Sequence, residues 1–65
     1  MVVTVNGERQ EIAAKTIPAL LQELDYDGEF LVVAVNQDVV QRRRWDEVEI
    51  KAGDRIEIVT PRQGG

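Results

Sequence analysis

The chain has 65 residues, with twelve acidic against eight basic side chains and a net charge of −4, and it contains no cysteine, histidine or serine. A chain this short forms one small domain that buries only about 60% of the surface exposed on unfolding, which argues against a deep catalytic cleft. It also lacks the usual nucleophiles and general bases, and its acidity disfavours binding to phosphate backbones. We therefore expect neither an enzyme acting alone nor a nucleic-acid-binding protein.

The longest apolar run, from Phe30 to Val35, is too short to span a bilayer, and the N-terminus lacks the basic and apolar regions of a signal peptide. The absence of cysteine agrees with a reducing compartment. Without His or Cys, a metal site would need clustered carboxylates, and residues 25–29 have neither the spacing nor the length of a calcium loop. We expect a soluble, cytoplasmic protein that binds no metal.

The N-terminal sequence VVTVNGERQEI predicts a β-hairpin. Asn6-Gly7 is a preferred pair for a type I′ turn, in which both central residues take positive φ. The first strand alternates Val3 and Val5 with Val2 and Thr4. The second strand is polar except for Ile12, which suits an edge strand that must not recruit other chains.

A helix is predicted to begin after Thr16, whose hydroxyl can cap the first turn, and Pro18 falls in that turn, where a missing N–H does no harm. The apolar positions that follow have helical spacing and form one stripe: Ile17, Leu20, Leu21 and Leu24. Residues 25–28 should end the helix, with Gly28 available for a left-handed cap.

The sequence FLVVAVN, residues 30–36, predicts an interior strand, and its lack of alternation predicts that both faces are at least partly covered. After a turn at residues 36–38, a short strand is expected at residues 39–41. The next stretch, RRRWDEVEI, is predicted to be irregular. Its apolar side chains should pack under the domain: Trp45, Val48 and Ile50.

The run Arg42, Arg43 and Arg44 is predicted to be a solvated face. The sequence AGD should form a turn in which Asp54 is a turn residue rather than a ligand. RIEIVT then alternates, with Ile56 and Ile58 on one face of a last strand.

These elements predict an α+β fold: a mixed sheet of four to five strands with one main helix on one face. The last strand should lie beside the first and parallel to it, in the middle of the sheet. The chain then divides into a domain of residues 1–60 and a flexible C-terminal tail of residues 61–65, with the sequence PRQGG.

The order of these elements and the terminal Gly-Gly resemble the ubiquitin-like β-grasp superfamily and, more narrowly, the ThiS family of sulfur carriers in thiamine (thiazole) biosynthesis. The matching segments cover nearly the whole chain: the opening strand with Asn6-Gly7, TIPALLQEL, VAVNQDVVQRRRW, AGDRIEIV and Gly64-Gly65. The most specific part is the spacing between the asparagine after the apolar strand, the tryptophan nine residues later, and Gly53-Asp54.

The resemblance implies that the carboxylate of Gly65 is adenylated by a partner, an adenylyltransferase of the ubiquitin-activating type (ThiF-like) that uses ATP and Mg²⁺. Sulfur from a cysteine desulfurase system then gives a thiocarboxylate, which a thiazole synthase (ThiG-like) consumes. The chain would bind no cofactor itself and would be a carrier rather than an enzyme.

The physical chemistry of the tail agrees with this role. A terminal carboxylate is ionised at neutral pH and needs activation before a sulfur nucleophile can attack it. Five extended residues reach about 17 Å, and glycine leaves only backbone width for a narrow channel. The tail residues expected to enter a partner's active site are Pro61, Arg62, Gln63 and Gly64.

Ordering such a tail costs about 1–2 kcal/mol per residue, so a docking surface elsewhere must offset that cost. The sheet face away from the helix is the predicted docking face, because exposed apolar patches are often interaction sites. Its expected residues are Val2, Thr4, Val32, Ala34 and Val59.

Three alternative functions share parts of this pattern. The small subunit of molybdopterin synthase is also a Gly-Gly thiocarboxylate carrier, but the short link DYDGEF after the helix favours the thiazole carrier. A ubiquitin-like protein modifier would use the same tail. A plain β-grasp binding module would not need the terminal glycines.

Overall fold

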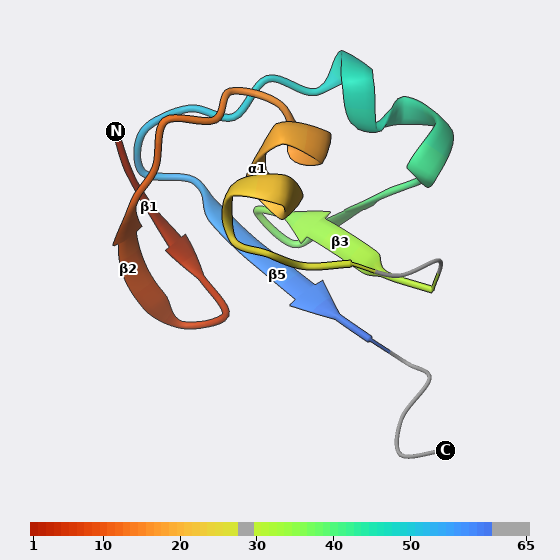
Figure 1. Cartoon of the computed structure of the whole chain (residues 1–65), viewed down its shortest axis with the longest axis horizontal. Coiled ribbons are helices and arrows are strands. Elements are labelled where there is room, and N and C mark those ends of the chain that lie inside the picture. The colour runs from red at the N-terminus through yellow and green to blue at the C-terminus, as the bar shows by residue number, and fades with distance from the viewer. Residues whose placement is uncertain (28–29, 61–65) are drawn as a thin grey trace.

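A computed structural model describes residues 1–27 and 30–60 (Figure 1). The elements follow the order ββαββ, a 3₁₀ helix and a last strand. Their bounds are β1 Val2–Val5, β2 Glu8–Glu11, α1 Ile17–Glu23, β3 Val32–Val35, β4 Asp38–Val40, the 3₁₀ helix η1 Arg42–Glu47, and β5 Arg55–Val59. The predicted α+β class is confirmed.

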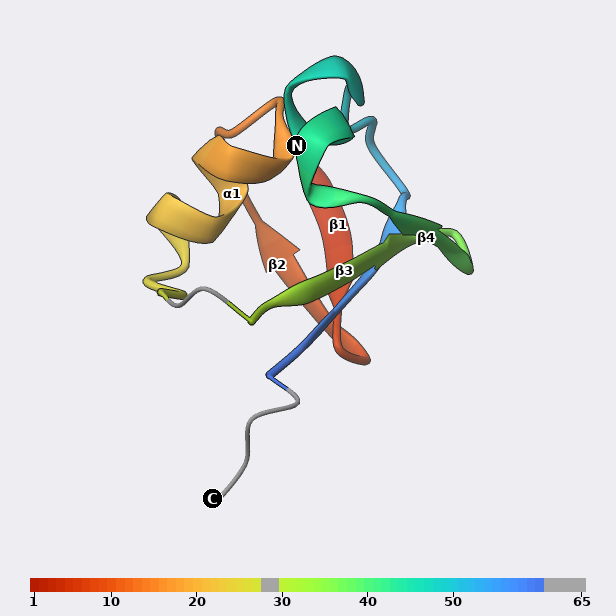
Figure 2. The same cartoon turned by 90° about the vertical axis from the view of Figure 1, so that its right-hand side faces the viewer.

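The strands form one five-stranded sheet in the order β2-β1-β5-β3-β4. β5 is parallel to β1, with Val5 opposite Ile56, and antiparallel to β3, with Val33 opposite Ile58. The polar strand β2 lies at one edge and the last strand lies in the middle, as predicted. Both helices lie on the same side of the sheet (Figure 2).

Two tight turns connect the strands of the two hairpins, β1 to β2 and β3 to β4. Asn6 and Gly7 have φ values of 50° and 86°, which confirms the predicted I′-like turn between β1 and β2. Asn36 and Gln37 have φ values of 52° and 76° and join β3 to β4 in the same way. Each turn therefore places an asparagine in the left-handed region, which its short polar side chain tolerates.

Helix α1 is capped at both ends. The Thr16 hydroxyl accepts a hydrogen bond from the amide of Ala19 at 3.4 Å, and Pro18 lies in the first turn, as predicted. At the other end Asp25 has φ 65°, and the amide of Tyr26 donates to the carbonyl of Leu21 at 2.8 Å, which is a Schellman cap. The left-handed cap residue is thus Asp25, and Gly28, which was expected there, lies outside the described residues.

A single apolar cluster lies between the sheet and the helices. The stripe of α1 contributes Ile17, Leu20 and Leu21, all buried, while Leu24 is half-buried. The sheet contributes its inward residues: Val3, Val5, Val33, Ile56 and Ile58. Among the described residues, no polar or charged side chain is buried.

The segment predicted to be irregular contains the 3₁₀ helix η1, so that expectation was wrong for residues 42–47. Trp45 is buried, as expected, and its indole N–H donates to the carbonyl of Val40 at 2.9 Å. Ile50 is also buried and Val48 is half-buried, and the amide of Ile50 donates to the carbonyl of Lys15 at 2.8 Å. This bond ties the segment after η1 to the segment that precedes α1.

Strand β3 is shorter than its sequence predicts. It spans Val32–Val35 and lies between β5 and β4, so the interior position is confirmed. Val33 is fully buried, but Val32 is 38% exposed and Phe30, which precedes the strand, is 58% exposed. The outward side of this strand is therefore only partly covered, as expected, and Ala34 on that side is half-buried. In the described residues, no helix is long and apolar enough to cross a membrane.

Candidate functional site

The site predicted from the sequence begins where β5 ends. β5 stops at Val59, and Thr60 is the last residue that the structure describes at this end. The predicted tail lies outside the described residues: Pro61, Arg62, Gln63, Gly64 and Gly65. The described part of the site is therefore the end of β5 and the outward face of the sheet beside it (Figure 1).

The outward face next to the end of β5 carries a valine patch, which we define as Val32, Ala34, Val39 and Val59. Val32 pairs directly with Val59, and Ala34 pairs with Val39. Val59 is 51% exposed and Val39 is 67% exposed. Because paired residues on neighbouring strands share a face, these side chains form one contiguous apolar surface across β5, β3 and β4.

The predicted docking face is divided by the register of the strands. Thr4 pairs with Arg55, so Val2 lies toward the start of β5, whereas Val59 lies four residues beyond Arg55 along a parallel strand. At about 3.3 Å per residue, Val2 and Val59 are offset by roughly 20 Å along the strands. The exposed side chains of Arg55 and Glu57 lie between them on β5. The five predicted residues share one face but do not form one patch.

Two exposed apolar residues near this site were missed by the sequence reasoning. Val39 was assigned to a strand but not to the docking face, and its pairing with Ala34 depends on the tight turn between β3 and β4. Phe30 was counted as part of the interior strand, although it precedes the observed β3 and is 58% exposed. Pairing residues outward from a two-residue turn at Asn36 and Gln37 would have placed Val39 opposite Ala34.

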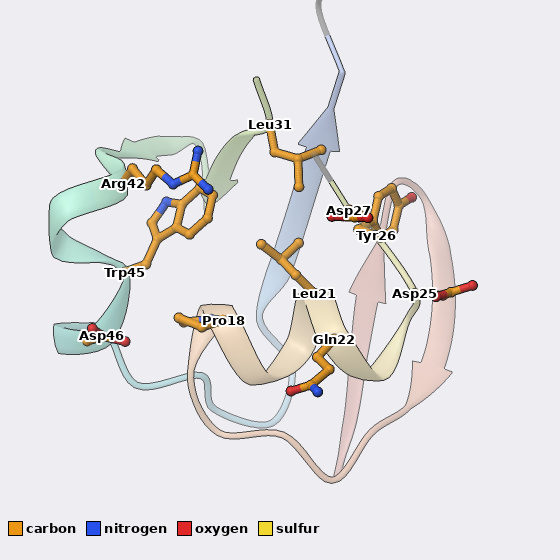
Figure 3. Close-up of a pocket in the computed structure, with 10 residues that line it drawn as sticks. All are labelled: Pro18, Leu21, Gln22, Asp25, Tyr26, Asp27, Leu31, Arg42, Trp45 and Asp46. Carbon is orange, nitrogen blue, oxygen red and sulfur yellow. The ribbon is translucent and has the colours of Figure 1, made fainter. Parts of the chain in front are cut away.

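A shallow groove lies on the other side of the molecule, between α1 and η1 (Figure 3). Leu21, Leu31 and Trp45 contribute apolar surface to it, and the guanidinium of Arg42 lies 5.2 Å from the centroid of the Trp45 ring. Asp25, Asp27 and Asp46 also line the groove. Among the described residues that line it, none is a serine, threonine, cysteine, lysine or histidine.

The arginine run behaves as predicted, because Arg42, Arg43 and Arg44 are all exposed. Arg44 forms an ion pair with Glu47 at 3.3 Å, a surface contact that contributes little stability. Asp54 is a turn residue, as predicted, and one carboxylate oxygen accepts from the amide of Lys51 at 2.9 Å. Within the described ranges, no group of three acidic residues is arranged to hold a metal ion.

A mixed sheet of this order, with one helix across it and the last strand in its centre, is the β-grasp fold of ubiquitin-like proteins. The fold matches the crystal structure of the thiamine biosynthesis protein ThiS from Geobacter metallireducens, with a TM-score of 0.85 and 30% identity over the whole of both chains. The β-grasp fold predicted from the sequence is therefore confirmed.

Sequence comparisons define the family. The ThiS family model matches residues 3–65, and the sulfur carrier protein ThiS of Escherichia coli is 30% identical over 66 aligned positions that cover all of both chains. The chain belongs to the ThiS family. These matches establish a sulfur carrier of thiamine biosynthesis, and they do not favour the molybdopterin or protein-modifier alternatives.

A third match differs in length. A thiazole synthase of Paramagnetospirillum magneticum is 35% identical to this chain over 66 aligned positions, which cover all of this chain but 20% of that protein. The chain thus spans about a fifth of the length of this relative. That protein carries a region similar to this chain within one longer polypeptide.

Proposed function

We propose that this ThiS-family sulfur carrier holds its sulfur as a thiocarboxylate on the terminal carboxyl carbon of Gly65. A partner enzyme joins the carboxylate to AMP and releases pyrophosphate. A persulfide sulfur then displaces AMP to give an acyl disulfide, and a second thiol cleaves its S–S bond, which leaves the thiocarboxylate and a disulfide between the two thiols. The chain contributes the carboxyl group and the docking surface, and the partner contributes the catalysis with ATP and Mg²⁺. It acts in the cytoplasm as a carrier rather than an enzyme and binds no cofactor of its own.

The observation that carries this proposal is the position of β5. The central strand of the sheet ends beside the valine patch, and the chain continues from there into PRQGG. A partner that binds the valine patch would therefore lie close to the start of the tail.

The proposed partners follow from the chemistry of each step. Adenylation requires an enzyme of the ubiquitin-activating, ThiF-like type, and sulfur delivery requires a cysteine desulfurase system. A ThiG-like thiazole synthase would consume the thiocarboxylate. The thiazole synthase that contains a region similar to this whole chain supports the last partnership, because two functions joined in one polypeptide commonly act together.

Substitutions can distinguish the contributions of the two ends of the outward face to partner binding. Val59→Asp places a charge in the valine patch and should weaken binding to the adenylating partner about tenfold or more, because an unpaired carboxylate would be desolvated at the interface. Val2→Asp places the same charge at the far end of the face, where Val2 is 37% exposed, and should change binding less than about threefold.

The measurement is the Kd of each variant for the adenylating partner by isothermal titration calorimetry. Thermal unfolding of both variants is the control, since each replaces an exposed strand valine with aspartate. Equal weakening by both variants would show that the partner covers the whole face, and no weakening by Val59→Asp would exclude the valine patch as the docking surface.

The proposed chemistry is tested by intact-mass analysis of the protein purified from its native cell. The expected result is a fraction of molecules in which one oxygen has been exchanged for sulfur, with fragmentation placing the change at Gly65. Mild alkylation should label that fraction, because a thiocarboxylate is a sulfur nucleophile. High-mass adducts through an isopeptide bond, without the exchange, would instead identify a protein modifier.

A further inference from the structure

β5 extends farther than β1, its parallel neighbour. The last paired residues of these two strands are Val5 and Ile56, whereas β5 continues to Val59 and stays paired with β3 up to Val32. Beyond Ile56, the side of β5 that faces β1 has no strand beside it. The backbone groups of Ile58 on that side therefore need other partners.

The side chain of Asn6 supplies those partners. Its Oδ1 accepts from the amide of Ile58 at 2.8 Å, and its Nδ2 donates to the carbonyl of Ile58 at 3.2 Å. The backbone amide of Asn6 donates to the carbonyl of Ile56 at 2.9 Å, so backbone and side chain together continue the ladder past the end of β1. We call the two hydrogen bonds between the Asn6 side chain and the Ile58 backbone the clamp. Nδ2 of Asn6 also donates to the hydroxyl of Tyr26 at 3.2 Å, which links the clamp to the segment after α1.

We propose that Asn6 is a positioning residue for sulfur loading. It holds the backbone of Ile58 from the side opposite β3, three residues before the tail begins at Pro61, and so limits the positions that the end of β5 can take. This inference rests on the proposed function, because it concerns how Gly65 is presented to the adenylating partner.

The expected kinetic signature follows from the state that the clamp affects. Without Asn6, the end of β5 is held by β3 alone, and the free protein gains conformational freedom that it must lose again on the partner. The substitution leaves the sequence of the tail unchanged, so we expect the bound complex to react at an unchanged rate. Loss of the clamp should therefore raise KM while kcat stays nearly constant, which is the pattern of a change confined to binding.

The chain contains a matched control at the opposite end of the same strand. The Oδ1 of Asn36 accepts from the amide of Arg55 at 3.0 Å, and its Nδ2 donates to Asp54 at 3.1 Å. Asn6 and Asn36 have φ values of 50° and 52°, so glycine can replace either without backbone strain. Asn36→Gly removes a comparable clamp far from the tail.

The experiment compares Asn6→Gly with Asn36→Gly as substrates for pyrophosphate release by the ATP-dependent adenylating partner. Asn6→Gly should raise KM about tenfold, the equivalent of re-ordering roughly one residue, with kcat within about twofold of the parent chain. Asn36→Gly should leave both constants within about twofold. In amide hydrogen exchange, Ile58 should lose protection in the first variant and Arg55 in the second.

Equal KM values for the two glycine variants would overturn the inference, as would loss of Ile58 protection with no change in KM. Failure of the proposed function is distinguishable, because the unsubstituted chain itself would then release no pyrophosphate. Should Asn6→Gly not fold, Asn6→Asp serves in its place: it keeps the acceptor for the Ile58 amide and loses the donor. An intermediate rise in KM, absent in Asn36→Asp, is expected, and its absence overturns the inference.

Discussion

Deleting Gly64 and Gly65 together is expected to reduce sulfur loading at least about a thousandfold, the equivalent of about 4 kcal/mol of activation free energy. The chain would then end at Gln63, with its carboxylate about 7 Å short of its normal position. Displacements of even 1 Å can cost about a hundredfold in rate when reacting groups must be aligned. The measurement is thiocarboxylate formation by intact mass in a reconstituted reaction.

Deletion of Gly65 alone is the matched control, because it shortens the reach by one residue while keeping a glycine carboxylate at the end. We expect this variant to be nearly as defective, since position rather than residue type is limiting. The free energy of unfolding should be unchanged in both, because glycine has no side chain to bury. Loading within tenfold of the parent chain after the double deletion would contradict the role of the terminus.

Replacing Leu20 with alanine is expected to lower the free energy of unfolding by about 2–5 kcal/mol. Leu20 has no exposed surface and lies on α1, the α-helix that packs across the sheet. A domain of this size has a total stability of roughly 3–10 kcal/mol, so a large share of the molecules should unfold. Urea denaturation followed by circular dichroism measures the change.

Leu24→Ala is the comparison variant, because the same substitution falls on the same stripe where the side chain is half-buried. Leu24→Ala should lower the free energy of unfolding less than Leu20→Ala does, since less apolar surface is removed from the core. Equal losses of unfolding free energy in the two variants would show that Leu20 is not more deeply buried than Leu24.

The sequence predicted the parts of the fold that local signals determine. Asn6-Gly7 has one strongly preferred turn, Thr16 and Pro18 mark one end of a helix, and the alternation around Ile56 and Ile58 assigns their shared face. Each signal acts within a few residues, so no knowledge of distant contacts was needed. The position of the last strand followed from the order of the elements.

The errors have physical causes in single residues. The 3₁₀ helix η1 buries only Trp45, so its six residues show no apolar period that could reveal a helix. At the end of α1, the left-handed position is taken by Asp25 rather than by a glycine, because the Schellman bonds around it compensate for the strain.

The candidate site was only partly predictable for a related reason. Alternation showed that Val2, Val32 and Val59 share one face, but their separation along the sheet depends on the register between β1 and β5. That register is set by pairing between residues more than fifty positions apart. The tail residues themselves stay a prediction, since they lie outside the described residues.

The central position of β5 also governs when the sheet can close during synthesis. β1 is synthesised before the other elements, but its parallel partner β5 is synthesised after them. β3 also pairs with β5, so this pairing cannot form until β5 has been made. Such long-range pairing is slow to form, because the chain loses the entropy of closing a long loop before the stabilising contacts between the strands can form. A chain that stops short of β5 lacks the strand that joins the two hairpins. Completion of the fold is thereby tied to synthesis of β5, the strand that precedes PRQGG, so a chain that stops before β5 cannot form the valine patch.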